Sequence, residues 1–190
     1  AGSRDYFDEK IDGNVNVTLR PRQPGSAFKP FAYATAFEKG YTPSTMLFDL
    51  ETNFSVTGAE PYIPKNYDGT FRGPVSMRQA LAQSLNIPSV KTLYLAGIED
   101  TIRTAEDLGI TTLKERSRFG LSLVLGGGEV TLTELTGGYA AFAADGLFSA
   151  PKNILAIEDR ESGKVTSPQN EGRRVLDPEI ARQVSDILSD

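Results

Sequence analysis

Apolar side chains recur three or four residues apart early in the chain, a spacing that places them on one face of a helix. The stripe consists of Phe28, Phe31, Ala32, Ala36 and Phe37. We therefore predict a helix over residues 26–39 that ends at Gly40. Pro30 is compatible with this helix because the N–H groups of a first helical turn have no partner within the helix.

Capping signals predict most of the other helices. Boxes of the form Ser/Thr-x-x-Glu/Gln begin at Ser76 and Thr131, so helices should run from there to about Ser84 and Asp145. Further helices are expected over residues 88–96, 100–108 and 178–188. The chain therefore reads as mainly helical.

The segments between these helices predict little regular structure. Residues 14–19 alternate apolar and polar side chains, which favours a short strand or an extended arm. Residues 41–74 are rich in Pro, Gly, Asn and Thr, and we expect a long ordered loop there. Within it, a hairpin is expected around 54–62 and a turn at 66–69, and a strand and turn are expected within 147–168.

Composition narrows the chemistry. The 190 residues carry a net charge of −5 without a basic block, which argues against nucleic-acid binding. The chain has neither histidine nor cysteine, which excludes Ser-His-Asp triads, Cys-His pairs and zinc sites built on those ligands. Asp49, Glu51 and Glu60 lack metal-ligand spacing, so we expect them in a solvated loop and expect no metal or cofactor.

The pair Ser26 and Lys29 is the candidate centre for covalent chemistry. A Pro-Gly turn leads into the serine, and the spacing of three places hydroxyl and amine on one helix face. A serine needs a base to become a nucleophile, and the amine is the base within local reach. Ser149 and Lys152 have the same spacing, but a proline beside that lysine predicts a loop.

A second pattern, Ser84-Leu85-Asn86, lies where one predicted helix ends and another begins. Serine and asparagine are common at helix ends for structural reasons alone. The order S-x-x-K and then S-x-N nevertheless matches two of the three signatures shared by penicillin-binding proteins and serine β-lactamases. The third, K-T-G or K-S-G, is absent; the nearest string begins at Lys91 inside a predicted helix.

With these motifs the chain resembles the transpeptidase domain of the bifunctional, class A penicillin-binding proteins. The resemblance extends over nearly the whole chain. It is carried by Arg22-Gln23-Pro24-Gly25-Ser26-Ala27-Phe28-Lys29-Pro30-Phe31, Pro64-Lys65-Asn66-Tyr67, residues 73–88 from Gly73-Pro74-Val75-Ser76 to Asn86-Ile87-Pro88, and Leu125-Gly126-Gly127-Gly128-Glu129-Val130-Thr131.

The resemblance implies an α+β fold of the penicillin-binding protein and serine β-lactamase type, mostly its helical part with an incomplete antiparallel sheet. Residues 1–190 would be a partial transpeptidase domain that lacks the leading strands and the K-T-G-bearing C-terminal strands. Apolar stripes that evolved to cover a sheet would then have to find another partner or face water, and the chain alone would be unstable or self-associating. We expect this of Phe28/Phe31/Ala32 and of Tyr139/Phe142/Ala143.

The resemblance also implies a reaction and its residues. Ser26 would be the nucleophile, Lys29 its base, Ser84 a proton relay, and Asn86 the holder of substrate and lysine. The implied substrates are peptidoglycan stem peptides ending in D-Ala-D-Ala, and β-lactams would form a stable ester with Ser26. The parent protein would lie on the extracytoplasmic face of a bacterial membrane, anchored by a segment outside this chain.

Two alternatives remain open at this stage. The same fold serves DD-carboxypeptidases and β-lactamases, which differ in how fast water clears the serine ester. Alternatively, the chain by itself is a non-catalytic excerpt, inactive without the third motif; a lost oxyanion donor costs roughly 2.7–4 kcal/mol of transition-state stabilisation.

Overall fold

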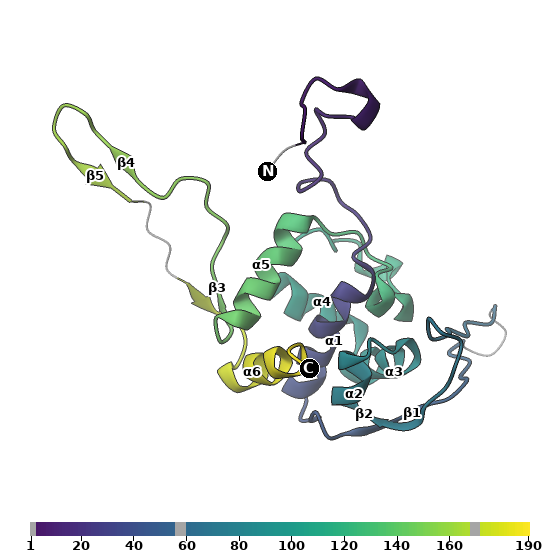
Figure 1. Ribbon diagram of the computed structural model, residues 1–190. Helices are drawn as coiled ribbons and strands as arrows, with labels where there is room; N and C mark the ends of the chain where they lie inside the picture. The colour runs from purple at the N-terminus through teal and green to yellow at the C-terminus, as the bar shows by residue number, and fades with distance from the viewer. Residues whose placement is uncertain (1–2, 56–59, 168–171) are drawn as a thin grey trace.

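The computed structural model describes residues 3–55, 60–167 and 172–190. Helix α1 (Lys29–Glu38) lies at the centre (Figure 1). Three helices pack against it: α3 (Asn86–Ala96), α4 (Ile98–Asp107) and α6 (Pro178–Ile187). The 3₁₀ turn η2 (Gly25–Phe28) leads directly into α1, so the predicted helix over 26–39 is confirmed, with a tighter first turn. Pro30 lies in the first turn of α1, and Gly40 follows its end with φ 92°.

The apolar stripe of α1 is covered by other helices of the same chain. Phe28, Phe31 and Ala32 have no exposed surface. Phe31 contacts the rings of Tyr139 and Phe142 on α5 (Leu132–Ala143). Of the two outcomes expected for this stripe without a sheet, another partner or exposure to water, the structure shows the first, because helices on several sides of α1 bury it.

The remaining helices follow the capping signals. The box at Ser76 is present, with Gln79 bonding reciprocally, and it opens the second helix. The third helix begins at Asn86 and not at Pro88, because proline is tolerated in a first turn. Their bounds are α2 (Met77–Ala82), α3 (Asn86–Ala96), α4 (Ile98–Asp107) and α6 (Pro178–Ile187), with further 3₁₀ turns η1 (Glu9–Ile11), η3 (Arg116–Arg118) and η4 (Leu121–Leu125).

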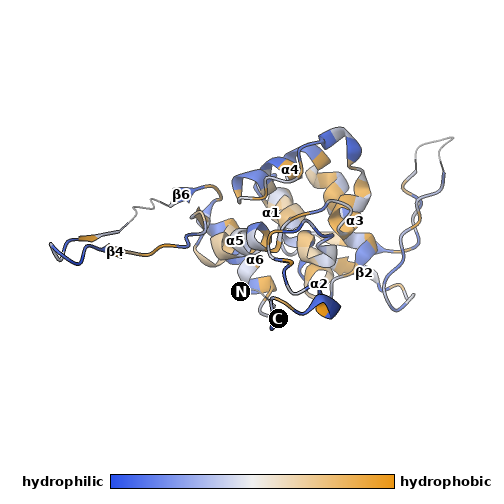
Figure 2. Cartoon of the chain, turned by 90° about the horizontal axis from the view of Figure 1, so that it is seen from above, coloured by the Kyte–Doolittle hydropathy of each residue, from blue (hydrophilic) through white to orange (hydrophobic). Residues whose placement is uncertain are grey.

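The strands of the described residues form short antiparallel pairs. β1 (Met46–Asp49) pairs with β2 (Gly73–Ser76), β3 (Leu147–Phe148) with β6 (Arg173–Arg174), and β4 (Ile157–Glu158) with β5 (Val165–Thr166). The β4–β5 hairpin projects away from the helices (Figure 1). The apolar residues are concentrated in the helical part of the chain (Figure 2). Helices with antiparallel strands confirm the α+β class expected from the sequence.

The long segment predicted as a loop contains two strands at its ends. β1 and β2 pair in the register Met46↔Ser76 to Asp49↔Gly73, which the loop prediction missed. The turn at 66–69 is confirmed by a bond from Gly69 N–H to the Asn66 carbonyl. The expected hairpin around 54–62 falls partly on residues 56–59, outside the described residues.

Residues 14–19 do not form a strand. They run through turns in an arm that leads away from the helices (Figure 1). Thr18 accepts a backbone bond from Thr133, and closer to α1 Arg22 exchanges two backbone bonds of 2.9 Å with Val130. In the described part of the chain, no helix combines the length and apolar character needed to cross a bilayer.

Candidate active site

The serine of the first motif stands on a tight turn in front of α1. Gly25 has φ 58°, a conformation that favours glycine, and it turns the chain from Pro24 into the 3₁₀ turn. Ser26 is exposed, and its hydroxyl has no hydrogen-bond partner among residues 3–55, 60–167 and 172–190. Its backbone N–H also has no acceptor within those ranges. Both groups are therefore available to a ligand.

The lysine of the same motif is buried. Lys29 has no exposed surface, and its Nζ donates to three oxygens of the 84–86 segment. The distances are 2.6 Å to the Ser84 carbonyl, 3.1 Å to Ser84 Oγ and 2.8 Å to Asn86 Oδ1. Burial lowers the pKa of the Lys29 amine to about 8, because desolvation disfavours its charged form.

The 84–86 segment is the corner between α2 and α3. Ser84 has φ 54°, an uncommon conformation for a residue other than glycine, and it turns the chain at the end of α2. Asn86 then opens α3, and its Nδ2 donates to the Lys65 carbonyl at 2.8 Å. With Nδ2 engaged there, Asn86 Oδ1 faces the lysine.

The structure brings together three of the four predicted site residues by direct hydrogen bonds: Lys29, Ser84 and Asn86. The Ser26 hydroxyl makes no such bond to the amine. It lies one turn before Lys29, whose backbone N–H donates to the Ser26 carbonyl. Catalytic hydrogen bonds are often long or unmade before a substrate binds, so this geometry is compatible with a serine–lysine pair.

Three contacts hold the serine turn in place. Gly126 lies so close to Gly25 that a Cβ at position 126 would come within 2.3 Å of the Gly25 nitrogen. The Arg22–Val130 bridge fixes the chain just before the turn. Tyr139 Oη donates to the Ala27 carbonyl at 3.0 Å, which ties α5 to the segment that carries Ser26.

Sequence reasoning missed two polar residues behind the corner. Asp49 was expected in a solvated loop, but it is fully buried at the end of β1. Asn66, also buried, donates Nδ2 to both carboxylate oxygens of Asp49 and accepts the Asn86 N–H at its Oδ1. The resemblance around Pro64–Tyr67 included Asn66, but no local signal linked it to Asp49.

The second serine–lysine match lies in a loop, as the sequence predicts. Ser149 and Lys152 are exposed and belong to no helix or strand. The nearest match to the third motif, at Lys91, lies inside α3. Within the described residues, no group of three or more acidic side chains could hold a metal ion.

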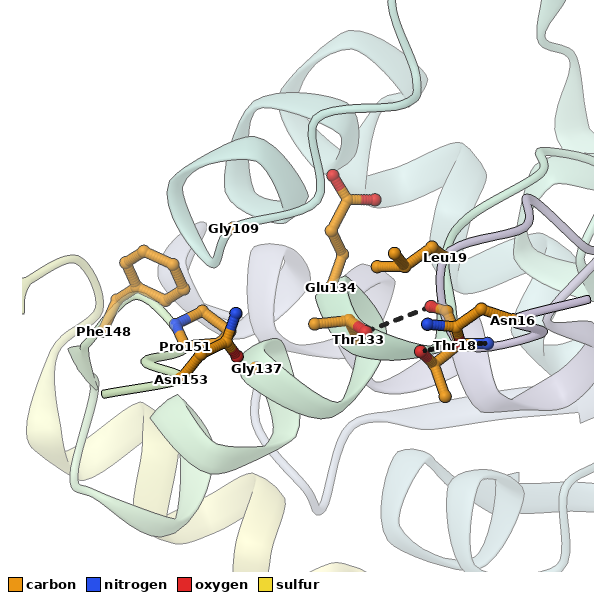
Figure 3. A pocket seen from close by; sticks show the side chains of 10 residues that line it. All are labelled: Asn16, Thr18, Leu19, Gly109, Thr133, Glu134, Gly137, Phe148, Pro151 and Asn153. Carbon is orange, nitrogen blue, oxygen red and sulfur yellow. Dashed lines mark hydrogen bonds between the residues drawn. The ribbon is translucent and has the colours of Figure 1, made fainter. Parts of the chain in front are cut away.

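One cavity lies away from the serine. It has a volume of about 470 Å³ and is lined by residues of the N-terminal arm, α5 and the 148–153 segment (Figure 3). Thr133 Oγ1 donates to the Thr18 carbonyl there at 3.0 Å. This cavity is lined by none of the four predicted site residues, Ser26, Lys29, Ser84 and Asn86. The candidate site is therefore defined by the contacts among their side chains and not by a cavity.

Known proteins share this sequence over most of its length. The family described as penicillin binding protein transpeptidase domain matches residues 9–190. Penicillin-binding protein 2D of Bacillus subtilis (strain 168) is 34% identical over 190 residues, which are 99% of this chain and 27% of that protein. Penicillin-binding protein 1A of Aquifex aeolicus (strain VF5) is 39% identical over 165 residues, covering 86% of this chain and 22% of that protein. The chain thus spans about a quarter of these relatives.

Solved structures share the fold. Penicillin-binding protein 1A from Haemophilus influenzae superposes with a TM-score of 0.83 at 26% identity, over 93% of this chain and 31% of that one. Penicillin-binding protein A from M. tuberculosis, as an imipenem acyl-enzyme complex, gives 0.80 at 18% identity, over 95% and 46%, and supports the fold alone. The family match, the relatives and the fold agree with the motif order read from Ser26 to Asn86, and the chain belongs to the penicillin-binding protein transpeptidase family.

Proposed function

We propose that this chain carries the acyl-transfer centre of a DD-transpeptidase that cross-links peptidoglycan stem peptides and is acylated by penicillins. Ser26 is the nucleophile. The observation that carries the proposal is the buried Lys29 amine, held against Ser84 and Asn86 one turn after an exposed serine with an unengaged hydroxyl. A serine next to a desolvated amine is a form of activated nucleophile.

The first step is attack by Ser26 Oγ on the carbonyl carbon between two D-alanines. The hydroxyl proton passes to Lys29 Nζ, which must be neutral to accept it. With a pKa of about 8, a useful fraction of the amine is neutral near pH 7. An ordinary lysine, with a pKa near 10.4, would be almost entirely charged.

Ser84 relays the proton to the leaving group. A hydroxyl both donates and accepts, so the 3.1 Å contact with Lys29 can serve the ammonium and, reversed, the neutral amine. The C–N bond breaks as the proton reaches the departing D-alanine nitrogen through Ser84 Oγ, and an ester on Ser26 remains. An amine of a neighbouring stem peptide then attacks the ester and releases the serine.

Two further groups support this chemistry. The unengaged Ser26 N–H can donate to the oxyanion that forms on the carbonyl. Asn86 Oδ1 orients the lysine, and the family resemblance gives Asn86 the second task of holding the substrate backbone. On this proposal residues 1–190 are part of a transpeptidase domain whose K-T-G or K-S-G strand belongs to the intact protein, which acts on the extracytoplasmic face of a bacterial membrane.

Covalent labelling of the intact protein with a fluorescent penicillin tests the proposal. We expect a stable label that disappears in Ser26→Ala and persists in Ser149→Ala, the matched change in the other serine–lysine pair. Ser26→Ala should fold normally, because the hydroxyl has no partner among the described residues. Labelling that survives Ser26→Ala would refute the assignment, and rapid nitrocefin turnover would favour a hydrolase.

A further inference from the structure

A fully buried carboxylate lies behind the candidate site. In the described part of the chain, no cationic side chain forms an ion pair with Asp49. The carboxylate accepts instead from Asn66 Nδ2, at 2.9 and 2.8 Å, and from the Arg72 N–H at 2.9 Å. A buried carboxylate without an ion pair depends on hydrogen bonds to its oxygens, and these three bonds tie Asp49 to Asn66 and to the backbone at Arg72.

The carboxylate determines which way the Asn66 amide points. A carboxylate only accepts, so it selects the nitrogen end of the amide. Asn66 Nδ2 also donates to the Thr70 carbonyl at 2.9 Å, which strengthens the same orientation. The oxygen end is thereby turned to the start of α3, where Oδ1 accepts the Asn86 N–H at 2.9 Å.

Asn66 caps the N-terminus of α3, which the N-cap residue of that helix does not do. The residue before α3 is Leu85, which has no side-chain acceptor for the first N–H groups. Asn66 satisfies one of these groups from another segment, while the neighbouring Lys65 carbonyl holds Asn86 Nδ2. Both the backbone and the side chain of Asn86 are therefore fixed by residues 65 and 66.

We propose that Asp49 and Asn66 are positioning residues that hold the backbone of Asn86 at the start of α3, where its side-chain oxygen meets the Lys29 amine. The chain of bonds runs from the Asp49 carboxylate through the Asn66 amide to the backbone N–H of Asn86, and the side-chain Oδ1 of the same residue lies 2.8 Å from Lys29 Nζ. Their catalytic role rests on the proposed function. The geometric role, the orientation of Asn86 and its effect on Lys29, can be measured without any acylation.

Two variants and their combination test the relay in the intact protein. In Asp49→Asn one of the two accepting oxygens becomes an NH2 donor, so the side chain at 49 no longer selects the nitrogen end of Asn66. We expect acylation by penicillin to slow roughly tenfold, the value of one hydrogen bond of about 1.4 kcal/mol. The exchange Asp49→Asn/Asn66→Asp restores a donor opposite a carboxylate that still accepts the Asn86 N–H. It should recover part of the rate.

A pH titration separates positioning from a merely structural role. In Asn66→Ala the lysine should lose its Asn86 acceptor, so the pKa of Lys29 and the pH midpoint of acylation should fall. In the exchanged pair a carboxylate stands closer to Lys29, so the midpoint should rise. The other charged groups here are Lys91, whose Nζ donates to the Phe48 carbonyl, and Arg72, which pairs with Asp68. Asp68→Asn removes a nearby exposed carboxylate as the control and should change neither rate nor midpoint.

NMR titration of the Lys29 amine, assigned with Lys29→Arg, gives the same midpoint without a substrate. Shifts in opposite directions for Asn66→Ala and the exchanged pair would support the inference. Variants that melt earlier but keep the wild-type Lys29 midpoint would overturn it and leave Asp49 and Asn66 as purely structural. If the wild-type protein is not labelled by fluorescent penicillin, the proposed function is refuted. The NMR titration of Lys29 still tests the positioning role in that case.

Discussion

Two segments of the chain have a serine three residues before a lysine, and the fold places them in opposite surroundings. Lys29 is buried among helices and bonded to three oxygens, whereas Lys152 is exposed in a loop. Ser26 is presented on a turn fixed by Gly126, whereas Ser149 follows a two-residue strand. The four-residue pattern therefore does not determine the surroundings of its serine and lysine. Desolvation of the amine and rigid presentation of the alcohol distinguish the two.

The strongest test of this contrast removes each amine in turn. Lys29→Met should reduce the rate of acylation by penicillin about 10³-fold, within the range typical of a lost general base. Lys152→Met should change the rate less than twofold, because that side chain is exposed. Labelling time courses of the two variants of the intact protein measure both values. Equal effects would show that burial does not separate the two lysines.

The next test moves the serine turn without touching the reacting groups. In Gly126→Ala the new Cβ would press on the Gly25 backbone, so the turn must shift. A displacement of about 1 Å can cost 10²-fold in rate, and we expect a loss of about that size. Gly163 also has positive φ but nothing within 4 Å, so Gly163→Ala in the β4–β5 hairpin is the matched control. An active Gly126→Ala variant would mean that the turn tolerates displacement.

The smallest expected effect is the pH dependence of acylation by the wild type. Only neutral Lys29 accepts the serine proton, so the rate should rise as pH increases through the lysine pKa of about 8. Between pH 7 and pH 9 the neutral fraction, and with it the rate, should increase about tenfold. Asn86→Asp would place an anion beside the amine and should move the midpoint upward. A flat profile from pH 7 to 9 would contradict Lys29 as the base.

Local signals in the sequence accounted for most helices. The capping box at Ser76, the cap at Thr131 and the stop at Gly40 all act over a few residues, and the helices begin and end near them. The strands were harder to predict. Residues 14–19 alternate apolar and polar side chains but have no partner strand among the described residues. β1 and β2 pair although more than 20 residues separate them, so no short stretch of sequence contains both.

The site was predictable only in part for the same reason. The motif order pointed to Lys29, Ser84 and Asn86, and the structure places these side chains together. Nothing nearby in sequence pairs Asp49 with Asn66, which lie 17 residues apart. An acidic residue in a loop-like segment is usually solvated, and only the tertiary structure shows that this one is enclosed.

The oxygens that hold the Lys29 amine come from residues 55 and 57 positions further along the chain. During synthesis the lysine emerges well before them and remains hydrated until α2 and α3 have docked. Until then the amine keeps an ordinary pKa and is a cation at neutral pH. On the proposed mechanism, the Ser26 hydroxyl of a nascent or unfolded chain is therefore unreactive. The amount of chain that a β-lactam acylates then measures only the folded molecules.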